Sequence, residues 1–293
     1  SGAGNHYGQF IANGLTINQN LTVGKNAGKG QSSSDTGYFR MTDVNLQNGH
    51  LTVGDYSGGL GGHFLLRKVQ INKGNLDIAP ESGRRGLVEI KNMTLTNGSA
   101  SVGYHAGANG TFLMDGLTID TGGLSIGQAA GRNLGIDPTW QDGSFKLKDV
   151  TVSGGNLDIK DSAGSTGGQF SMENVVVSTG KVSIGSVGDF GIENLNVKKG
   201  GMNVGNQAGA YGYLFSVHSS QFEETVSFGK EAGTHSGQLD FLDNEINNGD
   251  LIFGPDSANL TIEDNYINGD ITWDTGTTGT CSSNTVTGTN DCP

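Results

Sequence analysis

The sequence predicts an all-β fold, a parallel β-helix of about 11 to 12 coils with three short strands in each coil. A repeat of about two dozen residues runs along the chain, with clear copies at residues 37–54, 62–78, 110–127 and 143–159. Each copy contains three apolar pairs, and one residue separates the two members of a pair. This spacing is the period of a β-strand whose alternate side chains point to one side.

The apolar positions of successive copies align into columns, which indicates that the coils stack. The first inward position is mostly phenylalanine, and its members are Phe10, Phe39, Phe64, Val88, Phe112, Phe145, Phe170, Phe190, Phe215, Leu239 and Leu260. A single coil cannot bury its own apolar face, so stability comes from contacts between neighbouring coils. About eleven coils, each rising about 4.8 Å, would form a rod about 50 Å long. We expect a right-handed coil, the hand that parallel crossovers take.

Glycine recurs at fixed points of the repeat. It follows the third strand at positions such as Gly54 and Gly127, and it lies in the preceding turn at positions such as Gly49 and Gly98. We expect tight or positive-φ backbone at these corners, because glycine adopts it without steric cost. A flexible linker has no reason to carry phenylalanine at the same position of every repeat. The 51 glycines therefore do not indicate a flexible linker.

One continuous domain is expected over residues 1–293, with the coils at 10–273 and a closing turn with the cysteine pair at 274–293. No run of about 18 apolar residues is present, so no membrane-spanning segment is expected. The net charge of −12, with only 17 basic residues, disfavours nucleic-acid binding, which needs clustered lysine and arginine.

The two cysteines, Cys281 and Cys292, lie close together near the end of the sequence. No histidine or further cysteine accompanies them, so a zinc site is not expected. A disulfide that closes the last turn is one interpretation, and it implies an oxidising compartment. Two unpaired thiols are the alternative.

The third inward column changes from aliphatic to polar residues late in the chain. Its last members are Ser220, Asn244, Asn265 and Asn284. These residues could form an internal ladder in which each side-chain amide donates to a carbonyl of the neighbouring coil. Alternatively, the corner turns outward here and the asparagines are ordinary turn residues.

The outward positions contain no expected catalytic site. Asp77 and Asp158 share a column but lie three coils apart, about 14 Å, which is too far for a pair of catalytic carboxylates. The six histidines are scattered over turns and loops, and no Ser–His–Asp or Cys–His set is recognisable. We therefore expect a protein without enzymatic activity, metal or cofactor.

An insertion at residues 132–141 forms a candidate ligand loop that carries Asp137 and Trp140. A tryptophan in a protruding loop could stack on a sugar ring or pack against a partner. The alternative is that the ring folds back on its own coil.

These short coils, the few cysteines and the lack of a catalytic cluster resemble the passenger rods of bacterial type V secretion. The end of the sequence, CSSNTVTGTNDCP, is similar to the C-terminal cysteine pair of two-partner-secreted adhesins of the high-molecular-weight type. The resemblance rests on Cys281 and Cys292. It implies that the terminal loop holds an exported fibre at an outer-membrane secretion pore, on the surface of a Gram-negative bacterium.

The expected function is that of a secreted rod, the C-terminal part of a surface adhesin or fibre, that holds binding regions away from the cell. Its partners would be the outer-membrane pore and a cell-surface receptor or glycan. The first alternative is a β-helix that binds or cleaves polysaccharide, and the second is a self-associating filament subunit.

Overall fold

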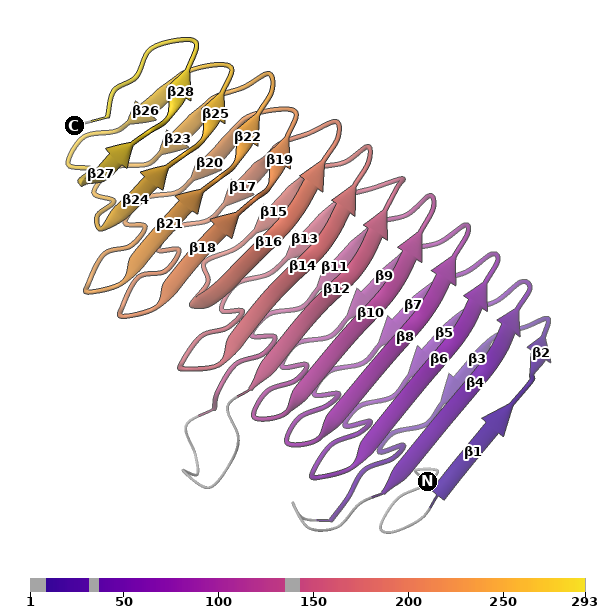
Figure 1. The fold of residues 1–293 in the computed structure, drawn as a ribbon. Coiled ribbons are helices and arrows are strands. Elements are labelled where there is room, and N and C mark those ends of the chain that lie inside the picture. Colours follow the sequence, from indigo (N-terminus) through magenta and orange to yellow (C-terminus); the bar gives the residue numbers. More distant parts are fainter. Residues whose placement is uncertain (1–8, 32–36, 135–142, 293) are drawn as a thin grey trace.

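The computed structural model describes residues 9–31, 37–134 and 143–292, and all regular structure in these ranges is β-strand. The strands form two parallel sheets that wind around one apolar interior (Figure 1). The predicted parallel β-helix is therefore confirmed.

The larger sheet, sheet A, has 17 strands and carries the first two apolar pairs of each coil. Its strands are β1 Gln9–Asn13, β2 Thr16–Ile17, β4 Tyr38–Leu46, β6 His63–Ile71, β8 Leu87–Leu95, β10 Thr111–Ile119, β12 Ser144–Val152, β14 Gln169–Val177, β16 Asp189–Val197, β18 Leu214–His218, β19 Gln221–Phe222, β21 Gln238–Leu242, β22 Glu245–Ile246, β24 Leu260–Glu263, β25 Tyr266–Ile267, β27 Gly279–Ser282 and β28 Thr285–Val286.

The smaller sheet, sheet B, has 11 strands and carries the third apolar pair. Its strands are β3 Leu21–Val23, β5 Leu51–Val53, β7 Leu76–Ile78, β9 Ala100–Val102, β11 Leu124–Ile126, β13 Leu157–Ile159, β15 Val182–Ile184, β17 Met202–Val204, β20 Val226–Phe228, β23 Leu251–Phe253 and β26 Ile271–Trp273. The strands β27 and β28 continue the stack on β24 and β25, so the expected closing turn at 274–293 also contributes part of a further coil.

The expected column of phenylalanines is a stack of rings. Every neighbouring pair of the predicted first column is a register pair in sheet A, from Phe10↔Phe39 to Leu239↔Leu260. The ring centroids of Phe145 and Phe170 lie 4.9 Å apart, and the planes differ by 5°. Phe10 is 39% exposed because only one described coil covers it.

The strand count per coil differs from the prediction over much of the rod. In seven coils the first two apolar pairs lie on one nine-residue strand, such as β4 or β16, so these coils have two strands rather than three. Each of these strands bends at a residue with positive φ, for example Asp43 (54°) and Lys68 (52°). The bend turns the chain through a corner without ending the backbone pairing.

The glycines of the repeat have a different role from the one expected. Positive φ occurs at the sheet A corner and in the loops, whereas neither Gly54 nor Gly127 has a positive φ. A Cβ atom on Gly54 would lie 2.6 Å from the backbone nitrogen of Lys25, and one on Gly127 would lie 2.6 Å from the carbonyl carbon of Gly103. Close approach of neighbouring coils, and not an unusual dihedral, therefore requires glycine here.

Candidate functional site

The late coils of sheet A are interrupted where the polar column begins. From β18 onward the long strand is replaced by two short ones, and the residues between them take no part in the strand register. Buried peptide groups at such a break need other hydrogen-bond partners. Ser220, Asn244 and Asn265 lie at these breaks and are 1%, 2% and 2% exposed, so the corner does not turn outward.

The asparagine side chains replace the missing backbone pairs. Asn244 donates from Nδ2 to the carbonyl of Val217 at 2.9 Å, and its Oδ1 accepts the backbone N–H of Ser220 at 2.9 Å. Asn265 repeats both bonds one coil later, to the carbonyl of Phe241 (2.9 Å) and from the N–H of Asn244 (2.8 Å). Each amide thus satisfies one donor and one acceptor of the preceding coil.

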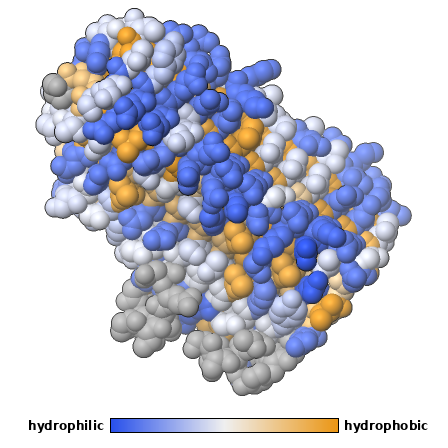
Figure 2. Space-filling model, viewed as in Figure 1, coloured by the Kyte–Doolittle hydropathy of each residue, from blue (hydrophilic) through white to orange (hydrophobic). Residues whose placement is uncertain are grey.

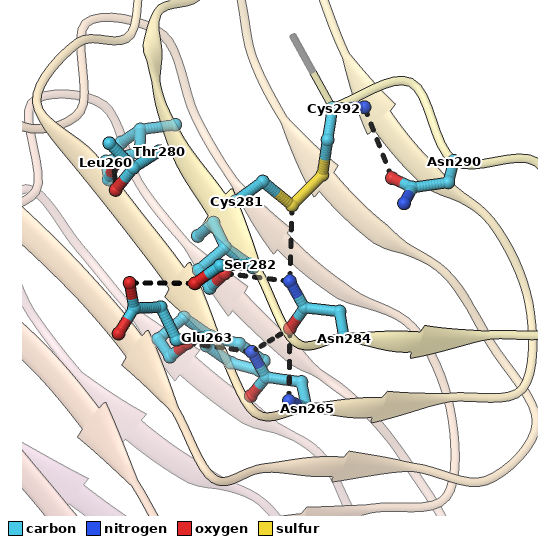
Figure 3. Close-up of a disulfide and its surroundings, with 11 residues drawn as sticks. Leu260, Glu263, Asn265, Thr280, Cys281, Ser282, Asn284, Asn290 and Cys292 are labelled. Atoms are coloured by element: carbon cyan, nitrogen blue, oxygen red, sulfur yellow. Dashed lines mark hydrogen bonds between the residues drawn. A yellow bond between two sulfur atoms is a disulfide. The ribbon is translucent and has the colours of Figure 1, made fainter.

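The ladder ends at the disulfide, as Figure 3 shows. Asn284 accepts the backbone N–H of Asn265 at 3.0 Å and donates to the carbonyl of Ile262 at 2.8 Å. Its Nδ2 also lies 3.2 Å from Sγ of Cys281. The internal polar column and the covalent closure therefore meet in the last coil.

Cys281 and Cys292 form a disulfide with a Cα–Cα distance of 5.9 Å. Cys281 lies on β27, in register with the buried Ile262 of the coil before it. Cys292 follows Asn290, which forms a bridge to Ile271 of sheet B. The bond therefore links sheet A to sheet B across the end of the described stack, and both cysteines are half-buried against the core.

Reduction of the disulfide is expected to loosen the last coil and leave the rest of the rod folded. The bond closes a loop with a sequence separation of 11, for which the chain-entropy model gives about 3 kcal/mol. Because stability in a stacked repeat is local, hydrogen exchange should rise in β27 and β28 and stay unchanged in β4 to β16. The Cys281→Ser/Cys292→Ser variant, measured without reductant, should show the same hydrogen exchange as the reduced protein. Loss of protection along the whole rod would contradict this expectation.

The part of the chain that the structure describes does not bring metal ligands together. No group of three or more histidine, cysteine, aspartate or glutamate side chains is placed to hold a metal ion there. Asp77 on β7 and Asp158 on β13 are separated by β9 and β11, so the structure does not bring them together. Asp137 and Trp140 lie outside the described residues.

One cluster of charged side chains was not predicted. On the outer face of sheet A, Glu89 of β8 accepts a hydrogen bond from Nζ of Lys91 at 2.5 Å and lies 2.8 Å from Nε2 of His63. Burial raises the pKa of Glu89, but the bonds to Lys91 and His63 outweigh it and leave the pKa below its ordinary value. Glu89 is 16% exposed, so solvent screens these contacts only partly.

Glu89 should make the protein lose stability in acid. A carboxylate whose folded pKa is lowered contributes its full stabilisation above the unfolded pKa, near 4.5, and loses it as the pH falls through the lower folded value. Glu89→Gln should therefore flatten the decrease in unfolding free energy below about pH 4.5. In an NMR titration, Lys91→Met should bring the Glu89 pKa back up, and an unmoved titration would contradict the role of the Lys91 bond.

A shallow groove of about 390 Å³ follows the bend of the first long strands. It is lined by Asp43, Val44, Asn45, Lys68, Gln70, Asn92 and Thr94. These residues come from β4, β6 and β8, and apart from Val44 they offer amide, hydroxyl or charged groups. Such groups can hydrogen-bond to a polar ligand lying along the rod.

Comparisons with protein-family models, with curated proteins and with solved structures found no match. Within the described ranges we find no helix with the length and apolarity needed to cross a bilayer.

Proposed function

We propose that the protein is a non-enzymatic extracellular rod, the C-terminal part of a surface-anchored adhesin or fibre, that displays binding regions away from the cell. The observation that carries this proposal is the unbroken stack of buried side chains that ends in a covalently closed coil. Each inner coil is paired with both neighbours, so a pull along the chain or a protease meets a continuous, cooperative structure.

The closed end is the proposed anchor. A disulfide forms and persists in an oxidising environment, which supports a location outside the cytoplasm. The surface of a Gram-negative bacterium is the location that the resemblance to two-partner-secreted adhesins implies. The partner at this end would be an outer-membrane secretion pore. A receptor or glycan would be bound by regions displayed at other points of the fibre.

Surface retention tests the anchor. Cells that display the protein are treated with a reductant that does not cross membranes, and the protein is then measured on the cells and in the medium. We expect reduction of Cys281 and Cys292 to release it, and we expect the Cys281→Ser/Cys292→Ser variant to appear in the medium without treatment. Retention that is equal in all three cases would refute the anchoring role.

The groove on β4, β6 and β8 favours polysaccharide binding as a second candidate function. Amide and hydroxyl side chains suit sugar hydroxyls, and three coils present them in a row. A screen against neutral and acidic glycans tests this: Gln70→Ala should weaken binding, while Gln221→Ala, in the same outward column far along the rod, should not. Formation of shortened glycan products would replace the structural role with an enzymatic one.

A further inference from the structure

The charge of this rod is distributed unevenly along its axis. Residues 1–200 contain 16 basic and 16 acidic residues, whereas residues 201–293 contain 1 basic and 13 acidic residues, which together give the net −12. The last coils are therefore strongly acidic, and the basic residues lie in the earlier coils. Exposed charge of this kind sets association partners and rates more than it sets the fold.

The corner of sheet A presents two outward residues per coil, the positive-φ residue at the bend and the one before it. We call the column that these pairs form from β6 to β24 the corner ridge. Its members are Arg67/Lys68, Lys91/Asn92, Asp115/Gly116, Lys148/Asp149, Glu173/Asn174, Glu193/Asn194, His218/Ser219, Leu242/Asp243 and Glu263/Asp264. All of them are exposed or half-buried, so another molecule can reach them.

The two outer coils at one end of the corner ridge are complementary in charge to the two outer coils at the other end. Within the chain, Lys68 also lies 3.7 Å from Asp43, and Lys91 donates a hydrogen bond to Glu89. The first coil of the ridge, that of β6, carries Arg67 and Lys68, and its last coil, that of β24, carries Glu263 and Asp264. The second coil from one end carries Lys91, and the second from the other end carries Asp243.

The inner coils, which are centred on Glu173 of β14, add little to this complementarity. Asp115 on β10 would face His218 on β18, which is counted as neutral at pH 7, and Lys148 on β12 would face Glu193 on β16 but is followed by Asp149. The repulsion expected where Glu173 meets its own copy is reduced, because Glu173 already pairs with Lys146.

We propose that two copies of this chain pair antiparallel along the corner ridge, about a two-fold axis near β14. The basic ridge residues of β6 and β8 then face the acidic ridge residues of β24 and β21 of the second copy, and symmetry makes each contact twice. Such a pair is closed, so it does not grow into a filament. The proposal is independent of the anchoring role of the disulfide.

The face that would be covered suits a weak protein contact. Figure 2 shows it from the outside, with apolar side chains scattered among hydrophilic ones. Leu65 and Leu113 are half-buried outward residues of β6 and β10 beside the ridge. Near the centre the same outward column holds Ser171, Gly191 and Ser216, which are small enough to let two faces approach. Since each exposed ion pair is weak and screened by salt, the dimer should be sensitive to ionic strength.

Charge reversal at the two ends of the ridge tests this pairing. Sedimentation velocity over a concentration series, at about 20 mM and about 500 mM salt, gives the dimer dissociation constant. Arg67→Glu/Lys68→Glu should raise that constant more than about tenfold at low salt, and so should Glu263→Lys/Asp264→Lys, because each places like charges together at both ends. The control variant Lys198→Glu/Lys199→Glu changes charge by the same amount away from the ridge and should dimerise like the unmodified chain.

Mixing the two reversed variants is the decisive measurement. In a mixed pair, the new glutamates of one copy face the new lysines of the other, and the natural charges still match at the opposite end. We expect the mixture to recover the original dissociation constant to within about threefold, with a maximum length in X-ray scattering close to that of one rod. A monomer at every concentration, a mixture that stays monomeric, or a particle of doubled length would overturn the proposal.

Discussion

Replacing Phe170 by alanine is expected to lower the free energy of unfolding by about 3–5 kcal/mol, the range for removing a buried aromatic ring. Phe170 is 1% exposed, and its ring stacks on those of Phe145 and Phe190 at 4.9 and 4.6 Å. Alanine would leave a cavity between two rings that the paired strands on both sides hold in place. Denaturant unfolding followed by circular dichroism measures the change.

Two controls separate this effect from a general loss of apolar area. Phe170→Leu keeps most of the volume and should cost clearly less than alanine. Phe10→Ala removes the same atoms from the exposed first coil and should cost least. Because neighbouring coils supply the stability, the Phe170→Ala rod should also exchange amide protons faster around β14 than at β6. A decrease below about 1 kcal/mol would show that the ring stack does not carry the interior.

The sequence predicts the fold well because stacking repeats the same requirement in every coil. A position such as Phe112 or Phe145 must be apolar, and its register partner in the next coil must be apolar too. The column can therefore be recognised from the amino-acid sequence alone. Alignment of the repeats was enough to identify the apolar core columns. In the structure, the members of a column pair with one another as they were aligned.

The bend in the long strands is not visible in the same way. The bend residues of the seven long strands all adopt positive φ, and they are Asp43, Lys68, Asn92, Gly116, Asp149, Asn174 and Asn194. Six of them are glycine, asparagine or aspartate, which favour this conformation, whereas for Lys68 it is imposed by the coils above and below. The same residue types are common in turns that end a strand, so local propensity marked the bend but did not show that one strand continues through it.

Some residues of the candidate site could be predicted from the sequence, and others could not. The asparagine column and the cysteine pair could be singled out because they are repeated or adjacent in the sequence. His63 and Glu89 meet diagonally between neighbouring coils, and Lys91 lies two residues after Glu89 on the same strand. They were missed because this combination occurs only once, and a comparison of outward neighbours within each strand and across aligned coils could have found them.

Replacing Asn265 by alanine is expected to cost about 2–5 kcal/mol, mostly in the last three coils. The substitution leaves the backbone N–H of Asn244 and the carbonyl of Phe241 without their side-chain partners, at a site that is 2% exposed. Each buried peptide group left unpaired costs about 1–3 kcal/mol, and a water in the space vacated by the amide would have to bond to both groups to offset this cost. The amide proton of Asn244 should exchange much faster, which hydrogen exchange with NMR detection measures.

Asn268 provides the matched control, because it lies in the same coil and donates to the carbonyl of Asn247 at 2.6 Å, but it is exposed. Water can replace that bond, so Asn268→Ala should change the unfolding free energy by less than about 1 kcal/mol. Asn265→Asp keeps an acceptor for the N–H of Asn244 but loses the donor to Phe241, and it buries a charge, so it should be no better than alanine. If Asn265→Ala behaved like Asn268→Ala, with the Asn244 amide still protected, the buried ladder would not replace the strand pairing that these coils lack.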